Sequence, residues 1–266
     1  MSEQDSVNGQ RERTLLRNGK LSIRKVLMRA AMSLARNIVP ILLAMVGPVV
    51  VLTLISEIFR GEFSVASIAV SYIAMVLLWV GFASVLHARF LDRQHSPPPW
   101  RVLIWSRAQL DFLFGILKIT GVLILMGVVV GILSFVAGPL AQLVGLVVAS
   151  FVWSRLAMVF PSASVGKPLA LEDSWGLTSH ARGRVFVLLG SLYIVSQFYV
   201  SLTLSLPLLY GSGWHIHATS AALLFGGAAV VVSILSAAYQ GLVEMRPPDV
   251  RETYLPQHGS GLADAF

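Results

Sequence analysis

The sequence predicts an all-α polytopic membrane protein in which six transmembrane helices form three hairpins, each preceded by an amphipathic surface helix. Hydrophobic residues make up 56% of the 266-residue chain and charged residues only 12%, whereas soluble domains carry about 25% charged residues. The apolar residues also gather into six runs, each close to the ~20 residues needed to cross a hydrocarbon core. Because a backbone in lipid must satisfy its own hydrogen bonds, each run is predicted to be a helix.

The six predicted spans are joined by short connections on one side and longer connections on the other. They cover approximately Ile38–Ile58, Val65–Leu86, Phe112–Val136, Leu140–Ala157, Val185–Leu209 and Ala218–Tyr239. In the first span, Gly47-Pro48 is expected to kink the helix by freeing a backbone carbonyl. At the end of the fourth span, the side chain of Arg155 is expected to extend to the lipid headgroups.

The lysines and arginines predict how the chain is oriented. Of the 20, all except Arg60 and Lys118 lie at the termini or near the connections that follow the second and fourth spans. This asymmetry places both termini in the cytoplasm. The predicted domains are a disordered basic arm over residues 1–20, a six-helix transmembrane domain over 21–243 and a cytoplasmic tail over 244–266. Since the loops account for the net charge of +7, no nucleic-acid partner is expected.

A polar or amphipathic stretch precedes each odd-numbered span, which suggests a repeated unit of one surface helix and one hairpin. The stretches are Leu21–Arg36, Trp100–Gln109 and Leu169–Arg184, and the spans after them begin about 74 residues apart. In the first stretch, Arg24, Lys25 and Arg29 fall mainly off the apolar face, as in helices that lie on anionic headgroups. In the third, Trp175 suits a membrane interface. Anchoring is favoured for both, and partner binding by the first stays open.

Polar side chains within the spans are the candidates for function. Lys118 lies about two turns into the third span, where its stem can reach the interface; an ion or substrate role is the alternative. Tyr193, Gln197 and Ser201 share one face of the fifth span. Because an unpaired amide in lipid is costly, Gln197 is expected to bond to another helix, through Gln142 or a backbone carbonyl. Packing is favoured over substrate contact for this stripe.

No catalytic, cofactor or metal site is predicted. The chain has no cysteine, and it lacks a phosphate-binding loop, the paired-histidine zinc motif and the dinucleotide fingerprint. The turn that holds Ser212, His215 and His217 offers no third metal ligand, and a serine protease in the membrane would place its nucleophile and base on separate helices. Gly127 and Gly131 favour close helix contact, within the protein or between copies.

Two motifs resemble a broad bacterial family. The first is the stretch from Leu21-Ser22-Ile23 to Arg36-Asn37-Ile38-Val39-Pro40, and the second is Arg155 and Pro161 followed by Glu172-Asp173-Ser174-Trp175-Gly176-Leu177-Thr178. The family consists of six-span membrane proteins similar to the membrane domain attached to some glycerophosphoryl diester phosphodiesterases. The chain departs from it at Ser179-His180-Ala181, where the family has Arg or Lys-Gly-Asn. The resemblance implies the architecture and an inner-membrane location but no activity, because the catalytic barrel is a separate domain.

These observations favour two functions. The first is a non-catalytic inner-membrane protein that scaffolds or modulates an envelope or lipid-related process. The second is a transporter or a membrane subunit of one, which the triple repeat and the polar face of the fifth span favour. The expected partners are a bilayer with anionic headgroups and either a second copy or another membrane protein. A water-accessible cavity lined by Tyr193, Gln197 and Lys118 would favour transport, and a dry bundle would favour the scaffold.

Overall fold

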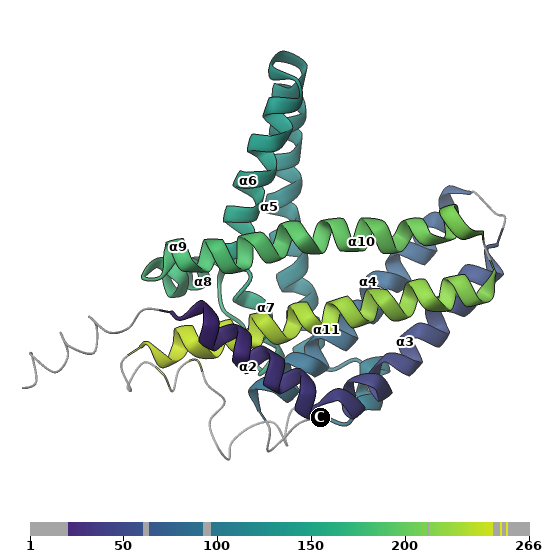
Figure 1. Ribbon diagram of the computed structural model, residues 1–266, viewed down its shortest axis with the longest axis horizontal. Helices are drawn as coiled ribbons and strands as arrows, with labels where there is room; N and C mark the ends of the chain where they lie inside the picture. Colours follow the sequence, from purple (N-terminus) through teal and green to yellow (C-terminus); the bar gives the residue numbers. More distant parts are fainter. Residues whose placement is uncertain are drawn as a thin grey trace, which may run out of the picture.

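The computed structural model describes residues 21–60, 64–92, 97–211 and 213–246, together with Arg251 and Tyr254 (Figure 1). These residues form helices and no strand. The helices are α2 (Ile23–Arg36), α3 (Ile38–Ile58), α4 (Val65–Leu91), η1 (Pro99–Leu103), α5 (Arg107–Ala137), α6 (Pro139–Leu156), α7 (Val159–Ser164), α8 (Leu171–Ser179), α9 (Arg182–Val185), η2 (Phe186–Gly190), α10 (Ser191–Tyr210) and α11 (Trp214–Glu244). The arm predicted over residues 1–20 and most of the tail predicted over 244–266 lie outside the described residues.

Six helical segments are long and apolar enough to cross a membrane, which confirms the predicted fold class of a multi-pass membrane protein. The first predicted span matches α3 at both ends, whereas the second continues five residues further as α4. The fourth span, Pro139–Ser164, combines α6 and α7, and the fifth, Arg182–Tyr210, combines α9, η2 and α10. The spans pack as the predicted hairpins: α3 with α4, α5 with α6, and α10 with α11.

The core of the protein surrounds α11, which contacts α2, α3, α4 and α10. An edge-to-face contact of Phe82 with Phe225, at 5.2 Å between ring centroids, joins α4 to α11. On its other side, α4 approaches η1 so closely that a Cβ added at Gly81 would overlap the carbonyl oxygen of Val102. η1 in turn places Leu103 against Gly47 of α3. Glycines therefore let three consecutive segments pack closely, α4 against the backbone of η1 and α3 against the Leu103 side chain.

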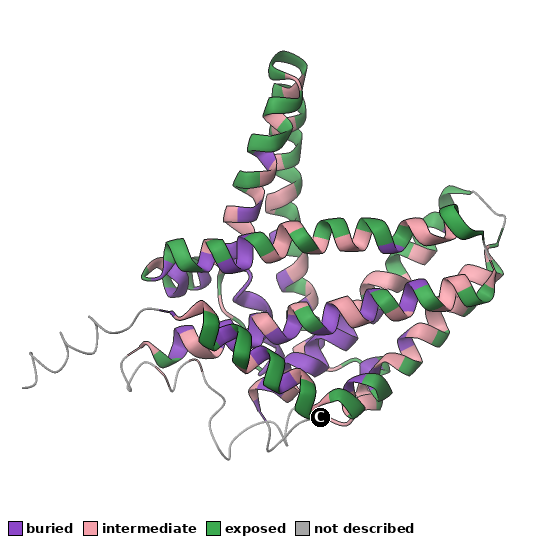
Figure 2. Cartoon of the chain, in the orientation of Figure 1, coloured by how far each residue is buried: buried purple, intermediate pink, exposed green. Residues whose placement is uncertain are grey.

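The α5/α6 hairpin stands away from the other four spans (Figure 1). Figure 2 shows it exposed along most of its length, and only 6% of the most apolar part of α5 is buried, against 61% for α11. At its tip, Gly138 has a φ of 58°, which suits glycine, and Pro139 begins α6. No atom of another residue lies near the Cβ positions of Gly127 and Gly131. These glycines make no close contact within the described chain, and contact between copies stays a prediction.

A helical segment precedes each hairpin, but the three segments differ. The second, η1, is a 3-10 helix of only five residues. It is tied to the start of α5, where Ser106 and Gln109 form a capping box and Gln109 Nε2 donates to the carbonyl of Arg101. The third segment, α8, ends at Ser179, so Arg182 begins the fifth span instead of ending a surface helix. The predicted internal repeat is thus present in the order of elements and not in their lengths.

The first segment, α2, packs on the end of α11. Its buried residues are Val26, Ala30 and Ser33. Arg29 forms two hydrogen bonds with the carboxylate of Glu244, at 2.9 and 3.1 Å. Of the three cations predicted to face anionic headgroups, Arg29 is therefore engaged within the protein, while Arg24 and Lys25 are exposed.

Replacing Glu244 by glutamine should have a small effect on stability. The side chains of Arg29 and Glu244 are 38% and 56% exposed, and exposed ion pairs contribute ~0.2–1 kcal/mol. We expect E244Q to lower the free energy of unfolding by less than about 1 kcal/mol, measured by thermal unfolding in detergent. The control K25Q removes an exposed charge of α2 and should leave stability unchanged. A larger loss in E244Q would mean that this pair, and not the apolar contact, attaches α2.

Candidate functional site: a crevice between the hairpins

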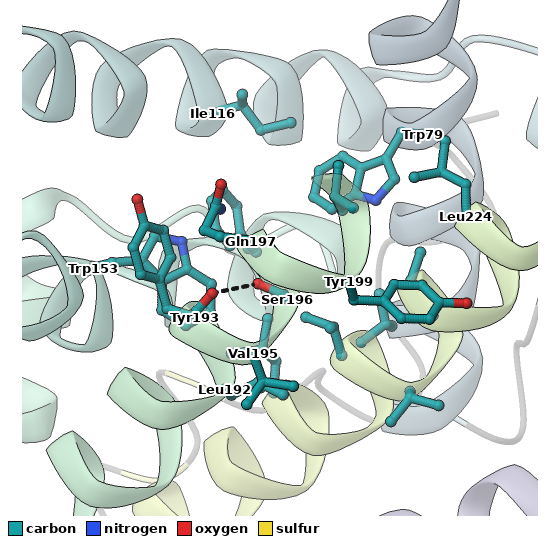
Figure 3. A pocket seen from close by; sticks show the side chains of 18 of the residues that line it. Trp79, Ile116, Trp153, Leu192, Tyr193, Val195, Ser196, Gln197, Tyr199 and Leu224 are labelled. Atoms are coloured by element: carbon teal, nitrogen blue, oxygen red, sulfur yellow. Dashed lines mark hydrogen bonds between the residues drawn. The ribbon is translucent and has the colours of Figure 1, made fainter. Parts of the chain in front are cut away.

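A crevice of about 590 Å³ opens where the α5/α6 hairpin departs from α10 and α11. α5, α10 and α11 form its long walls, and α4 contributes Trp79 and His87. Figure 3 shows Gln197 of α10 between Trp153 of α6 and Trp79, with Ile116 of α5 across from it. Since all of these residues belong to membrane spans, the crevice lies within the part of the protein that lipid surrounds.

Helix register and small residues shape the crevice. In α10, Tyr193, Ser196, Gln197 and Val200 line it, and their spacing places them on one helix face. α10 follows the π-helical turn η2, a feature often found at functional sites. On α11, Gly226 has no neighbouring atom at its Cβ position, so it leaves the crevice open where any side chain would fill it.

The tyrosines of α10 are held in place by α6 and α11. The Tyr193 ring lies 5.4 Å from that of Trp153, and Ser196 Oγ donates to the carbonyl of Tyr193 at 2.8 Å (Figure 3). The Tyr199 ring packs so tightly on Gly227 that a Cβ there would clash with it, and its hydroxyl donates to the carbonyl of Leu223 at 2.7 Å. These aromatic walls are therefore fixed by specific contacts.

The Gln197 amide differs from its neighbours because it is exposed and makes no hydrogen bond within the described residues. The bond predicted between Gln197 and Gln142 is not formed. Gln142 lies near the start of α6, is exposed and does not line the crevice. An amide at a wall that is otherwise mainly apolar offers a donor and an acceptor to a ligand.

Of the predicted intramembrane residues, the structure brings together only Tyr193 and Gln197. Ser201 and Lys118 are exposed and do not line the crevice. The polar stripe predicted on α10 therefore ends after Gln197, and Lys118 is free to extend along lipid towards the interface. The lysine takes no part in a cavity with Tyr193 and Gln197.

His87 is a buried ionisable group just beyond Leu86, where the predicted second span ended, so it was not among the predicted site residues. It is 1% exposed and lines the crevice. Its Nδ1 lies 2.7 Å from Ser236 Oγ, so α4 and α11 supply a histidine–serine pair from two helices. However, Ser236 is 2% exposed and does not line the crevice. A substrate in the crevice cannot reach its hydroxyl, and the pair acts as a hydrogen bond that joins the two helices.

A second cavity, of about 380 Å³, lies between α3, α4, α10 and α11 near the connections at their other end. His217 lines it, and His217 Nε2 is 3.9 Å from Glu57 Oε1. Leu224 lines both this cavity and the crevice. The two spaces are therefore neighbours, with the Leu224 side chain at their shared wall.

Arg155 does not extend to the surroundings as predicted. It is 3% exposed, because α8 covers the end of α6: Ser174 Oγ donates to the carbonyl of Arg155 at 2.8 Å, and Trp175 lies over the guanidinium. Trp175 itself is 40% exposed. The prediction was wrong because it considered the fourth span alone, whereas α8 folds back over the end of that span and covers Arg155.

The described residues hold no group of three or more histidine and acidic side chains that could bind a metal ion. Ser212, which shares its turn with His215 and His217, lies outside those residues.

No protein-family model, curated protein or solved structure matches the chain. What the crevice can do follows from its chemistry: apolar and aromatic walls with one free amide suit an amphiphilic molecule.

Proposed function

We propose that this chain is a non-catalytic integral membrane protein that binds a lipid in the crevice and acts in an envelope or lipid-related process. The crevice itself carries the proposal: its volume of about 590 Å³ falls within the ~300–1,000 Å³ of ligand sites. In a bilayer the molecule available to fill an apolar space among spans is a lipid chain. The Gln197 amide, which has no partner within the described residues, would bind a polar group of that lipid.

The proposed location is the bacterial inner membrane, with both termini in the cytoplasm. The asymmetry of basic residues supports this orientation, and the resemblance to the bacterial six-span family supports the membrane. Exposed Leu27, Met28 and Met32 of α2 lie beside the exposed cations Arg24 and Lys25. This combination suits a helix at the surface of an anionic leaflet.

Filling the crevice should prevent lipid from entering it. No atom lies within 4 Å of the Cβ position of Gly226, so Gly226→Phe introduces a ring into the crevice from a position with open space. The matched control is Gly127→Phe, which adds the same ring to open space on α5. With a phospholipid that carries a photoreactive acyl chain, we expect crosslinking to crevice peptides to fall about tenfold in G226F, equivalent to ~1.4 kcal/mol, and to be unchanged in G127F. Equal crosslinking in both variants would contradict the proposal.

The transport alternative has one observation in its favour, the position of Leu224 between the crevice and the second cavity. A passage from one to the other would have to move this side chain. In reconstituted vesicles, a transporter would move a fluorescent lipid between leaflets, and Leu224→Ala would accelerate the movement. If neither the wild type nor L224A moves the lipid, binding alone is the function that the crevice supports.

A further inference from the structure

Arg155 is a buried cation that has no anionic partner among the residues that the structure describes. Its Nε and Nη1 atoms are inaccessible and make no hydrogen bond within the described residues. Among the described residues, the charged side chain close enough to act on it is that of Arg182, another cation. Two aromatic rings lie beside it: the guanidinium carbon is 5.1 Å from the centre of the Trp175 ring and 5.8 Å from that of Phe151.

Such an arrangement is unfavourable unless an anion completes it. A guanidinium stays protonated in proteins, and a buried charge needs an opposite charge to offset its lost hydration. Aromatic faces attract the cation, but they do not accept the N–H bonds that lie in the plane of the guanidinium. Glu172 and Asp173 of α8 are exposed and form no ion pair with Arg155. The missing group must therefore come from outside the described chain.

The position of Arg155 along α6 indicates where that anion comes from. Gly138 forms the tip of the hairpin, and Arg155 lies 17 residues after it. At a rise of 1.5 Å per residue, this separation corresponds to ~26 Å along the helix. This is close to the ~30 Å thickness of the hydrocarbon core, so a hairpin tip at one surface places Arg155 at the headgroups of the other. The abundant anions at that depth are lipid phosphates.

We propose that Arg155 and Arg182 form a binding site for a phosphate group at the membrane surface, and specifically for an anionic phospholipid headgroup. Arg155 provides free N–H donors beneath the Trp175 ring, and the exposed Arg182 provides a second cation. Arginine is suited to phosphate because its planar N–H donors match the phosphate oxygens. Because Nε and Nη1 are inaccessible, a phosphate would reach them once the partly exposed Trp175 ring had moved aside. Arg155 does not line the crevice, so this site is independent of the function proposed above.

The test compares lipid binding by the full chain and three variants. Phosphatidylglycerol, with phosphatidylcholine as the zwitterionic reference, is titrated into the detergent-purified protein, and bound lipid is counted by native mass spectrometry. We expect R155Q to bind phosphatidylglycerol about tenfold more weakly and R182Q to lose part of the affinity. R36Q, which removes an exposed arginine from α2, should bind like the wild type. Tryptophan fluorescence should change on titration in the wild type and change less in R155Q.

Two outcomes would overturn the proposal: wild-type affinity in R155Q, or an equal loss in R155Q and R36Q, which would indicate general charge attraction. If R155Q does not fold, the test rests on R182Q, which should fold because Arg182 is exposed. Wild-type affinity for phosphatidylglycerol in R182Q would then contradict the proposed site.

A separate titration adds inorganic phosphate to compete with the lipid. Competition at millimolar concentration would assign the site to a soluble phosphate, and no competition would assign it to the lipid headgroup. The G226F variant of the crevice should bind phosphatidylglycerol here normally.

Discussion

Replacing Gly81 by alanine is expected to lower the free energy of unfolding by about 3 kcal/mol, the upper end of the range for overpacking. The added Cβ would overlap the carbonyl oxygen of Val102. Because this atom belongs to the backbone, it cannot rotate away as a side chain would. Val102 is 3% exposed, and η1 also packs on α3, so relief at Gly81 requires the whole turn to shift.

The measurement is unfolding in detergent followed by circular dichroism, and the control is Gly127→Ala. Gly127 lies in a helix with open space at its Cβ position, so alanine should be neutral or stabilise by up to ~1 kcal/mol through helix propensity. The difference between the two variants isolates the steric effect. Equal stability of G81A and G127A would mean that α4 and η1 do not meet as closely as described.

Replacing His87 by alanine is expected to cost about 3 kcal/mol, from the loss of a buried ring and of its hydrogen bond. The ring fills space between α4 and Phe112, at 5.8 Å between centroids. Its removal leaves a void that joins the crevice, because His87 lines it. H87A should therefore be less stable and also accept a bulkier lipid.

Ser236→Ala separates the two contributions. It leaves His87 in place but removes the hydroxyl that lies 2.7 Å from Nδ1, so a cost of about 1–3 kcal/mol is expected for the unpaired nitrogen. The double variant shows whether the two losses are coupled. If S236A is as stable as the wild type, the hydrogen bond does not join α4 to α11. His180→Ala, at an exposed position, is the control for loss of a histidine.

The spans could be predicted because their signal is local. A run of apolar residues long enough to cross lipid fixes a helix whatever its neighbours, and the predicted bounds of α3 agree with the structure at both ends. The predicted span is shorter than the helix where polar residues continue it: α4 extends through His87 and Arg89 to Leu91. Hydropathy identifies the apolar run but not the full length of the hydrogen-bonded helix. His87 lies beyond that run, and it was therefore not predicted as part of the site.

The candidate site could be predicted only in part, because it depends on contacts between distant residues. Tyr193 and Gln197 were identified from their shared helix face, which is a local property. The pairing of His87 with Ser236 crosses 149 residues, and no local pattern indicates it. Likewise, the burial of Arg155 depends on the return of α8 over α6. The sequence of either helix alone does not contain this information.

The lengths of the helices make the protein sensitive to the thickness of its bilayer. α5 and α11 each have 31 residues, or ~46 Å, whereas α3 has 21, or ~31 Å, close to the hydrocarbon core. The long helices must tilt to match a core that suits α3. Because α5 packs on α4 and α7 near one end only, its tilt sets the width of the crevice. A change in membrane thickness is therefore expected to change the width of the mouth of the crevice.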